Sequence, residues 1–321
     1  MKVRYIQHDF TVTESRKKHK PVALTKPIDS PIKAPMFNNF LLLLTAAIWG
    51  FAFVAQRVGM EHVGPFLFNG VRFALGGISL LPVFFITGGK SSALNRSSLT
   101  AGALAGILLF GGASLQQIGI QYTTAGKAGF ITGLYVVLVP LLGSFLGTQS
   151  GKYRWIGAFS TAIGLYLLSV NTEFSVNTGD FLVFLSAFFF ACHVLYLAKV
   201  SPLQNPILLS ILQYLIVSLC SILYAFHAER IQFHSLLSAW LPILYGGIFS
   251  VGIAYSLQVI AQKKAHPTHA AILLSMEGLF AAMGGALLLG ERLTVRETFG
   301  AFLMLSGMVI SQWREGNKKK T

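Results

Sequence analysis

Ten apolar segments, each close to the length that an α-helix needs to cross a bilayer, account for most of this chain. They are residues 38–57, 65–86, 99–119, 125–147, 154–170, 179–199, 206–227, 239–260, 267–289 and 296–313. Charged residues make up only 11% of the chain, against about 25% in an ordinary soluble domain. The sequence therefore predicts an all-α membrane protein with ten transmembrane helices in a lipid bilayer.

Basic residues gather at both ends of the chain. They are Lys18, Lys20, Lys26 and Lys33 before the first segment, and Arg314, Lys318, Lys319 and Lys320 after the last. Ten crossings put both termini on one side, and Lys and Arg are retained mainly on the cytosolic side. We therefore expect cytosolic termini and, because no disulfide-bearing domain is evident, a bacterial inner (plasma) membrane. The net charge of +14 lies in tails and loops, so no nucleic-acid partner is expected.

The two halves of the chain resemble each other at an offset of 141 residues. This offset pairs Pro65 with Pro206, Gly106 with Gly247, Gln117 with Gln258 and Gln121 with Gln262. Each half holds five segments, and because five is odd, the second half must enter the membrane in the opposite orientation. Two inverted five-helix repeats are typical of secondary transporters, whose solute site lies near the midplane between the repeats.

The repeat divides the chain into four expected parts. These are a disordered basic cytosolic tail (1–36), the first repeat (37–172), the second repeat (173–314) and a second basic tail (315–321). Small residues such as Gly102 and Gly106 predict close helix packing. We expect this packing within the chain, with a contact between the subunits of a homodimer as the alternative.

Several stretches resemble helices of the EamA-type family of the drug/metabolite transporter superfamily. They are LLTAAIWGFAFVAQRVG (Leu43–Gly59), the stretch around Arg72, YTTAGKAGFITGLYVVLVPLLG (Tyr122–Gly143) and HPTHAAILLSMEGLFAAMGGALLLGERLT (His266–Thr294). The resemblance covers residues 38–313 and implies carriage of small metabolites, commonly outward and including amino acids. The chain departs from the family at Gly278, where a proline often follows the ninth-helix glutamate, so a proline kink is not implied here.

Two charged side chains stand inside apolar segments. Arg72 lies about 10 Å into the second segment and Glu277 about 15 Å into the ninth, at a rise of about 1.5 Å per residue. Charge at such depth is costly and usually functional. Arg72 is a candidate anchor for a carboxylate or phosphate, or a buried strut. Glu277 is a candidate site for a coupling proton or a substrate amine, or the partner of Arg72 in a structural ion pair.

The repeat supplies a counterpart for each polar residue inside the segments. It aligns Arg72 with Gln213, Tyr135 with Glu277, Ala52 with His193, and Gln117 with Gln258. Three of these pairs are unequal, as a site for an asymmetric solute requires.

Four of these residues, with Trp49, complete the set of candidates. His193 is a candidate proton relay or a neutral imidazole bonded to a neighbour. Gln117 and Gln258 form a candidate pair of polar gates, and Trp49 and Tyr135 are candidates for a cavity wall, with ordinary packing as the alternative.

No metal site or cofactor is predicted. His266 and His269 share a helical face, but no carboxylate or cysteine completes a ligand set, so a solvated helix start is expected. An intramembrane enzyme is not expected, because a nucleophile with its base, or paired carboxylates, are missing at membrane depth. The predicted function is alternating-access export of small, amino-acid-like or other organic solutes, with proton coupling as an option. A membrane scaffold or receptor and a passive channel are the alternatives.

Overall fold

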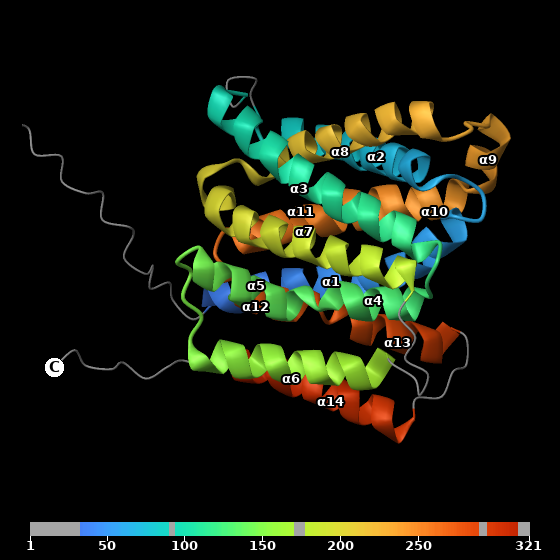
Figure 1. Ribbon diagram of the computed structural model, residues 1–321. Helices are drawn as coiled ribbons and strands as arrows, with labels where there is room; N and C mark the ends of the chain where they lie inside the picture. The colour runs from blue at the N-terminus through green and yellow to red at the C-terminus, as the bar shows by residue number, and fades with distance from the viewer. Residues whose placement is uncertain (1–32, 90–93, 170–176, 289–293, 314–321) are drawn as a thin grey trace, which may run out of the picture. The chain divides into compact units, whose positions relative to one another are not determined.

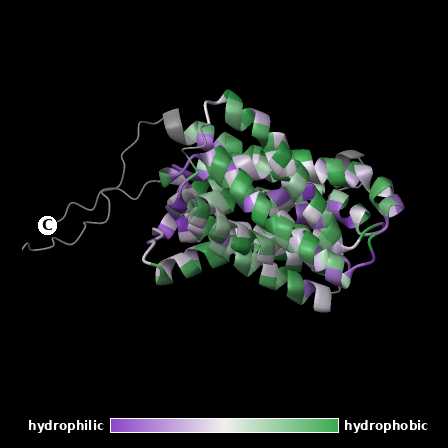
Figure 2. Ribbon diagram, turned by 90° about the horizontal axis from the view of Figure 1, so that it is seen from above, coloured by the Kyte–Doolittle hydropathy of each residue, from purple (hydrophilic) through white to green (hydrophobic). Residues whose placement is uncertain are grey.

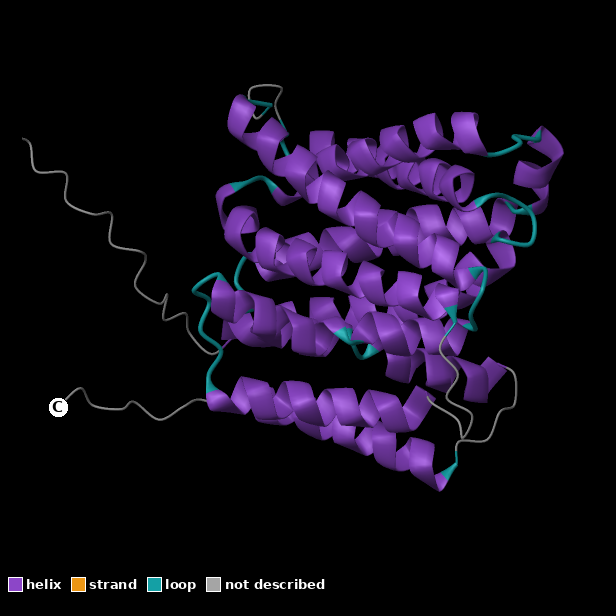
Figure 3. Cartoon of the chain, in the orientation of Figure 1, coloured by secondary structure: helices purple, strands orange, loops and turns teal. Residues whose placement is uncertain are grey.

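The computed structural model describes residues 33–89, 94–169, 177–288 and 294–313, and all regular structure in these ranges is helical (Figure 1, Figure 3). Met1–Ile32 forms a unit apart from Lys33–Thr321. The predicted tails at 1–36 and 315–321 therefore lie almost wholly outside the described residues.

Helices cover every predicted segment. In the first half these are α1 (Lys33–Gly59), α2 (Pro65–Ile86), α3 (Arg96–Ile120), α4 (Ala125–Gly133), α5 (Tyr135–Phe145) and α6 (Lys152–Ser169). In the second half they are α7 (Thr178–Val200), η2 (Ser201–Leu203), α8 (Pro206–Ala228), α9 (Phe233–Ser238), α10 (Trp240–Leu244), the π-helix η3 (Tyr245–Tyr255), α11 (Ser256–Gln262), α12 (Pro267–Leu274), α13 (Glu277–Leu288) and α14 (Val295–Ser311).

Seven helical stretches of the described chain are long and apolar enough to cross a membrane. They are Met36–Gly59, Pro65–Ile86, Arg96–Ile120, Ala125–Phe145, Thr178–Leu203, Pro206–Ala228 and Trp240–Gln262. Large apolar side chains also point outward, among them Phe145 and Ile86, which are more than 80% exposed (Figure 2). A surface of this kind is unfavourable in water and suits lipid. The chain is an integral, multi-pass membrane protein.

Local sequence signals set several helix starts. Pro65, Pro206 and Pro267 occupy the first turn of α2, α8 and α12, where the missing N–H leaves no intrahelical bond unmade. Asn95 and Asn177 each begin a capping box, in which the cap side chain and the residue three positions on exchange hydrogen bonds with the backbone.

Helix packing follows the same plan in both halves. The contact of α3 with α7 has its counterpart in the contact of η3 with α1. Likewise, α4 and α5 pack against α7, as α12 and α13 pack against α1. Two contacts, α2 with α8 and α6 with α14, join helices that the repeat itself aligns. This exchange symmetry is consistent with a two-repeat architecture.

The pairing of α6 with α14 depends on four glycines. A Cβ built on Gly164 would lie 2.5 Å from the carbonyl oxygen of Gly300, and one on Gly157 would lie 2.6 Å from that of Gly307. The repeat aligns Gly157 with Gly300 and Gly164 with Gly307, so the two contacts exchange when the halves are exchanged. Without side chains at these positions, the two backbones can touch.

Both halves break their fourth helix at the same place. Leu134 separates α4 from α5, and Ser275 and Met276 separate α12 from α13. An offset of 142 residues brings Leu134 onto Met276, so the breaks correspond. The second break occurs without the proline that the family often carries after the glutamate.

We predict that Gly164→Ala destabilises the protein by about 1–3 kcal/mol, because the added methyl group meets a backbone oxygen that cannot move alone. The measurement is the thermal unfolding midpoint of the detergent-solubilised protein. Gly126→Ala is the matched control, since nothing lies within 4 Å of its Cβ position. Equal midpoints for the two variants would contradict the packing argument.

Candidate functional site

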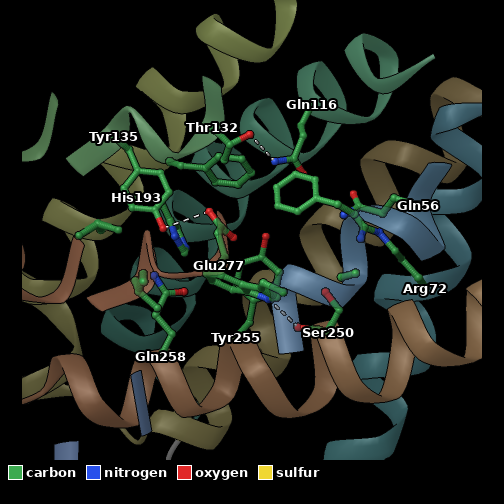
Figure 4. Close-up of a pocket in the computed structure, with 16 residues that line it drawn as sticks. Gln56, Arg72, Gln116, Thr132, Tyr135, His193, Ser250, Tyr255, Gln258 and Glu277 are labelled. Carbon is green, nitrogen blue, oxygen red and sulfur yellow. Dashed lines mark hydrogen bonds between the residues drawn. The ribbon is translucent and has the colours of Figure 1, made fainter. Parts of the chain in front are cut away.

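A cavity of about 40 Å³ lies beside the two helix breaks (Figure 4). Its lining comes from both halves of the chain: Trp49, Ala52, Phe53, Gln56, Arg72, Gln116, Thr132, Tyr135, Phe190, His193, Val194, Ser250, Tyr255, Gln258, Leu274 and Glu277. Such a volume holds a few water molecules and excludes a metabolite.

Glu277 and Tyr135 lie at the helix breaks. Each is the first residue of a half-helix, Glu277 of α13 and Tyr135 of α5. The Tyr135 hydroxyl donates a hydrogen bond to Glu277 Oε1 over 3.3 Å, and both side chains are buried. A helix N-terminus favours negative charge, so the break supplies a polar place for a carboxyl group inside the membrane protein.

Arg72 lies at another end of the cavity, beside Gln56 (Figure 4). Its side chain is 2% exposed, and its Nε donates to Asn69 Oδ1 over 2.9 Å. The rings of Phe68 and Phe73 lie 5.4 and 5.1 Å from the guanidinium carbon. Among the described residues Arg72 makes no ion pair, and the expected pairing with Glu277 is not formed.

His193 lies on α7, and a hydrogen bond of 2.9 Å joins its Nε2 to Gln213 Oε1 on α8. The bonded imidazole is the simpler of the two interpretations of this residue. Gln213 is the repeat counterpart of Arg72, and His193 is the counterpart of Ala52. The same position relative to the second helix therefore holds an imidazole in one half and a methyl group in the other.

Gln258 and Gln117, which the repeat aligns, have different surroundings. Gln258 lines the cavity, and its Oε1 has no hydrogen-bond partner in the described structure. Gln117 lies outside the lining, and its Nε2 donates to the main-chain oxygen of Gln56 over 3.4 Å. The neighbouring Gln116 lines the cavity instead and donates to Thr132 Oγ1 over 3.0 Å.

Trp49 joins the cavity wall to the π-helix. Its Nε1 donates to the main-chain oxygen of Ser250 over 3.2 Å, and its ring lies 4.5 Å from that of Tyr255. Thr45, one turn earlier on α1, donates to the main-chain oxygen of Ala254 over 3.1 Å. Donors on α1 thus satisfy carbonyl oxygens of η3, a helix type that occurs mostly at functional sites.

The structure brings six of the seven predicted site residues together: Glu277, Arg72, His193, Tyr135, Gln258 and Trp49. It adds Gln56, Gln116, Thr132 and Ser250, which sequence reasoning missed. Gln56 follows Ala52 by one helical turn, so helical spacing from an aligned position was the available signal. Ser250 gave no signal, because it is small and lies within an apolar run.

The two histidines of the HPTH stretch have structural partners. Nδ1 of His266 accepts a hydrogen bond from the backbone N–H of Thr268 and caps α12. His269 is hydrogen-bonded to Asn39 and Ser311, each over 2.9 Å. His269 is therefore part-buried between α1 and α14, and the expected solvated helix start is wrong for it.

Known proteins resemble the chain over most of its length. The sequence model described as the EamA-like transporter family matches twice, at residues 36–170 and 177–312. An "Uncharacterized transporter" of Archaeoglobus fulgidus is 32% identical over 87% of each chain. A "Probable amino-acid metabolite efflux pump" of Salmonella typhimurium is 25% identical, covering 85% of this chain and 94% of its own.

Two further comparisons agree. The "Uncharacterized inner membrane transporter YedA" of Escherichia coli is 24% identical over 86% of this chain and 90% of its own. A solved crystal structure superposes with a TM-score of 0.73 at 17% identity, covering 87% of this chain and 96% of that one, which shows a shared fold. The family match extends over both halves, and the relatives are named as transporters and not as enzymes. The chain belongs to the EamA-like transporter family.

Proposed function

We propose that the protein is a secondary transporter that exports small organic solutes, such as amino-acid-like metabolites, by alternating access. The observation that carries this proposal is the pair of corresponding helix breaks beside a polar central cavity. Broken helices at matching places in two halves are the arrangement with which transporters bind solutes near the midplane. The relatives named as amino-acid metabolite efflux pumps support the direction and the solute class.

The proposed membrane topology has ten crossings, with the second five helices inverted relative to the first. Seven stretches meet the length and hydropathy of a span, and α6, α12 with α13, and α14 complete the ten. The exchange symmetry of the helix contacts supports the inversion. With the basic tails in the cytosol, α1 begins and α14 ends at the cytosolic face of an inner membrane.

Two contacts at opposite ends of the repeats would control access to the cavity. At the external end, Lys127 Nζ contacts Asp180 Oδ2 over 2.6 Å, and Thr123 donates to Asp180 Oδ1 over 2.6 Å. We call the Lys127–Asp180 contact the outer latch. It joins the start of α4 to the start of α7.

The corresponding contact at the cytosolic end lies between His269 and Asn39. A hydrogen bond of 2.9 Å joins His269 Nε2 to Asn39 Oδ1, and we call this contact the inner latch. Offsets of 142 and 141 residues map Lys127 onto His269 and Asp180 onto Asn39. The two latches are therefore repeat counterparts, built from different chemistry.

Both latches are formed in this structure, and the cavity is too small for a metabolite. These two features support an occluded state of the transport cycle. Opening either latch while the other stays closed would expose the cavity to one side of the membrane, as alternating access requires.

Glu277 would couple transport to protons. It is the carboxyl group of the described cavity lining, and it shares a hydrogen bond with Tyr135 rather than an ion pair. A carboxyl in such a place can take up a proton when the cavity faces one compartment and release it in the other.

We predict that Glu277→Gln abolishes flux driven by a pH gradient in proteoliposomes, while exchange of labelled for unlabelled solute continues, because the amide keeps the shape but carries no proton. Candidate solutes come from comparing metabolites of cells with and without the gene. Tyr135→Phe is the matched control, since it removes the hydrogen bond to Glu277 and leaves the carboxyl. Unchanged pH-driven flux in Glu277→Gln would remove the coupling role.

The second prediction concerns the latches. Breaking the outer latch with Asp180→Asn should favour the outward-open state by up to roughly tenfold, the effect of about 1.4 kcal/mol. His269→Ala should favour the inward-open state. The measurement is the labelling rate of Leu274→Cys, in a Cys192→Ala, Cys220→Ala background, by an impermeant thiol reagent applied from each side. If both variants changed labelling in the same direction, the latch assignment would fail.

A further inference from the structure

The guanidinium of Arg72 is buried, yet its charge has no partner of opposite sign in the described structure. Among the described residues the one ion pair is the outer latch. Glu277 lines the same cavity but accepts its hydrogen bond from Tyr135. A buried cation without a counter-charge is costly. The geometry of Arg72 therefore calls for an anion from outside the chain.

The surroundings of Arg72 hold it from one side. Nε donates to Asn69 Oδ1, and Asn69 Nδ2 in turn donates to the main-chain oxygen of Ala113 over 3.1 Å. Two phenylalanine rings contact the guanidinium, and a Cβ on Gly246 would lie 3.2 Å from Arg72 Cδ. The side chain is thus fixed by its Nε edge and stem, and no hydrogen bond of its two Nη groups to described residues is present.

The opposite repeat shows how this position is closed when it is not used. There Gln213 replaces Arg72, and His193 lies against it with a hydrogen bond of 2.9 Å. In the first repeat the counterpart of His193 is Ala52, which lines the cavity and is 1% exposed. An alanine at this position leaves the space that the imidazole fills in the other half.

We propose that the transported solute carries a single carboxylate, which binds the two Nη groups of Arg72 in the space left by Ala52. A guanidinium matches a carboxylate with two parallel hydrogen bonds. One fixed positive charge neutralises one negative charge, which favours a carboxylate over a doubly charged phosphate. Ala52 is then a specificity-determining residue, because its small side chain keeps the Nη groups accessible. This inference rests on the proposed transport function.

The experiment measures the thermal unfolding midpoint of the full-length protein in lipid nanodiscs at constant ionic strength. The probes are pairs that differ in one group: acetate with acetamide, benzoate with benzamide, L-alanine with L-alaninamide, L-phenylalanine with L-phenylalaninamide, and inorganic phosphate alone. We expect at least one carboxylate to raise the midpoint, with its amide giving no shift. If no carboxylate raises the midpoint, if amides act equally, or if phosphate alone acts, the inference is overturned.

The variants test the two named residues. Arg72→Gln, which installs the residue of the other repeat, should weaken carboxylate binding by roughly tenfold to a hundredfold, because the charge and both donors are lost. Ala52→His should weaken it at least tenfold by filling the space. Ala52→Ser is the matched control and should bind within about twofold of the unaltered protein. Tight binding retained by Arg72→Gln or Ala52→His would refute the assignment.

A further variant covers the case in which Arg72→Gln does not fold. Arg72→Lys keeps the charge but loses the planar pair of donors, and about tenfold weaker binding is expected. Flux separates this inference from the transport proposal. Saturable flux of a neutral solute without carboxylate binding would overturn the carboxylate site alone. Carboxylate binding without saturable flux of the bound probe would overturn transport and leave the site.

Discussion

The structure depends on one constraint of the bilayer: backbone polar groups inside a membrane protein must find partners, so irregular backbone is tolerated only where protein or a cavity surrounds it. The breaks at Leu134 and at Ser275–Met276 are such irregular points, and both adjoin the central cavity. Tyr135 and Glu277 follow the breaks directly and point their polar groups at each other. The need to satisfy the interrupted helices and the placement of polar side chains at the centre are therefore a single arrangement.

A symmetric scaffold here carries asymmetric chemistry. The glycine contacts between α6 and α14 exchange with one another when the halves are exchanged, as do the helix breaks. The side chains at corresponding positions differ, as in Arg72 against Gln213 and Tyr135 against Glu277. Such a division lets the backbone take up two mirrored conformations while the cavity keeps one fixed polarity for its solute.

Much of this arrangement could be predicted from the sequence. The apolar periodicity and the 141-residue offset placed helices over every segment and brought six of seven candidate residues to one cavity. The offset pointed to Gln117, whereas Gln116 lines the cavity. A repeat aligns backbones, but the π-helix of the second half alters the direction in which its side chains point, and α3 has no such distortion. The partner of Arg72 could not be predicted either, because sequence spacing does not tell which groups share a cavity wall.

The chemical difference between the two latches has a consequence for the energetics of the transport cycle. The outer latch is an ion pair, with the Lys127 side chain 20% exposed, whereas the inner latch joins an imidazole to an amide. Dissolved salt screens exposed charge pairs and leaves neutral hydrogen bonds almost unaffected. The balance between outward and inward states would therefore respond to the ionic strength of the external medium and scarcely to that of the cytosol. A scaffold with near-equal halves would in this way sense the composition of only one compartment.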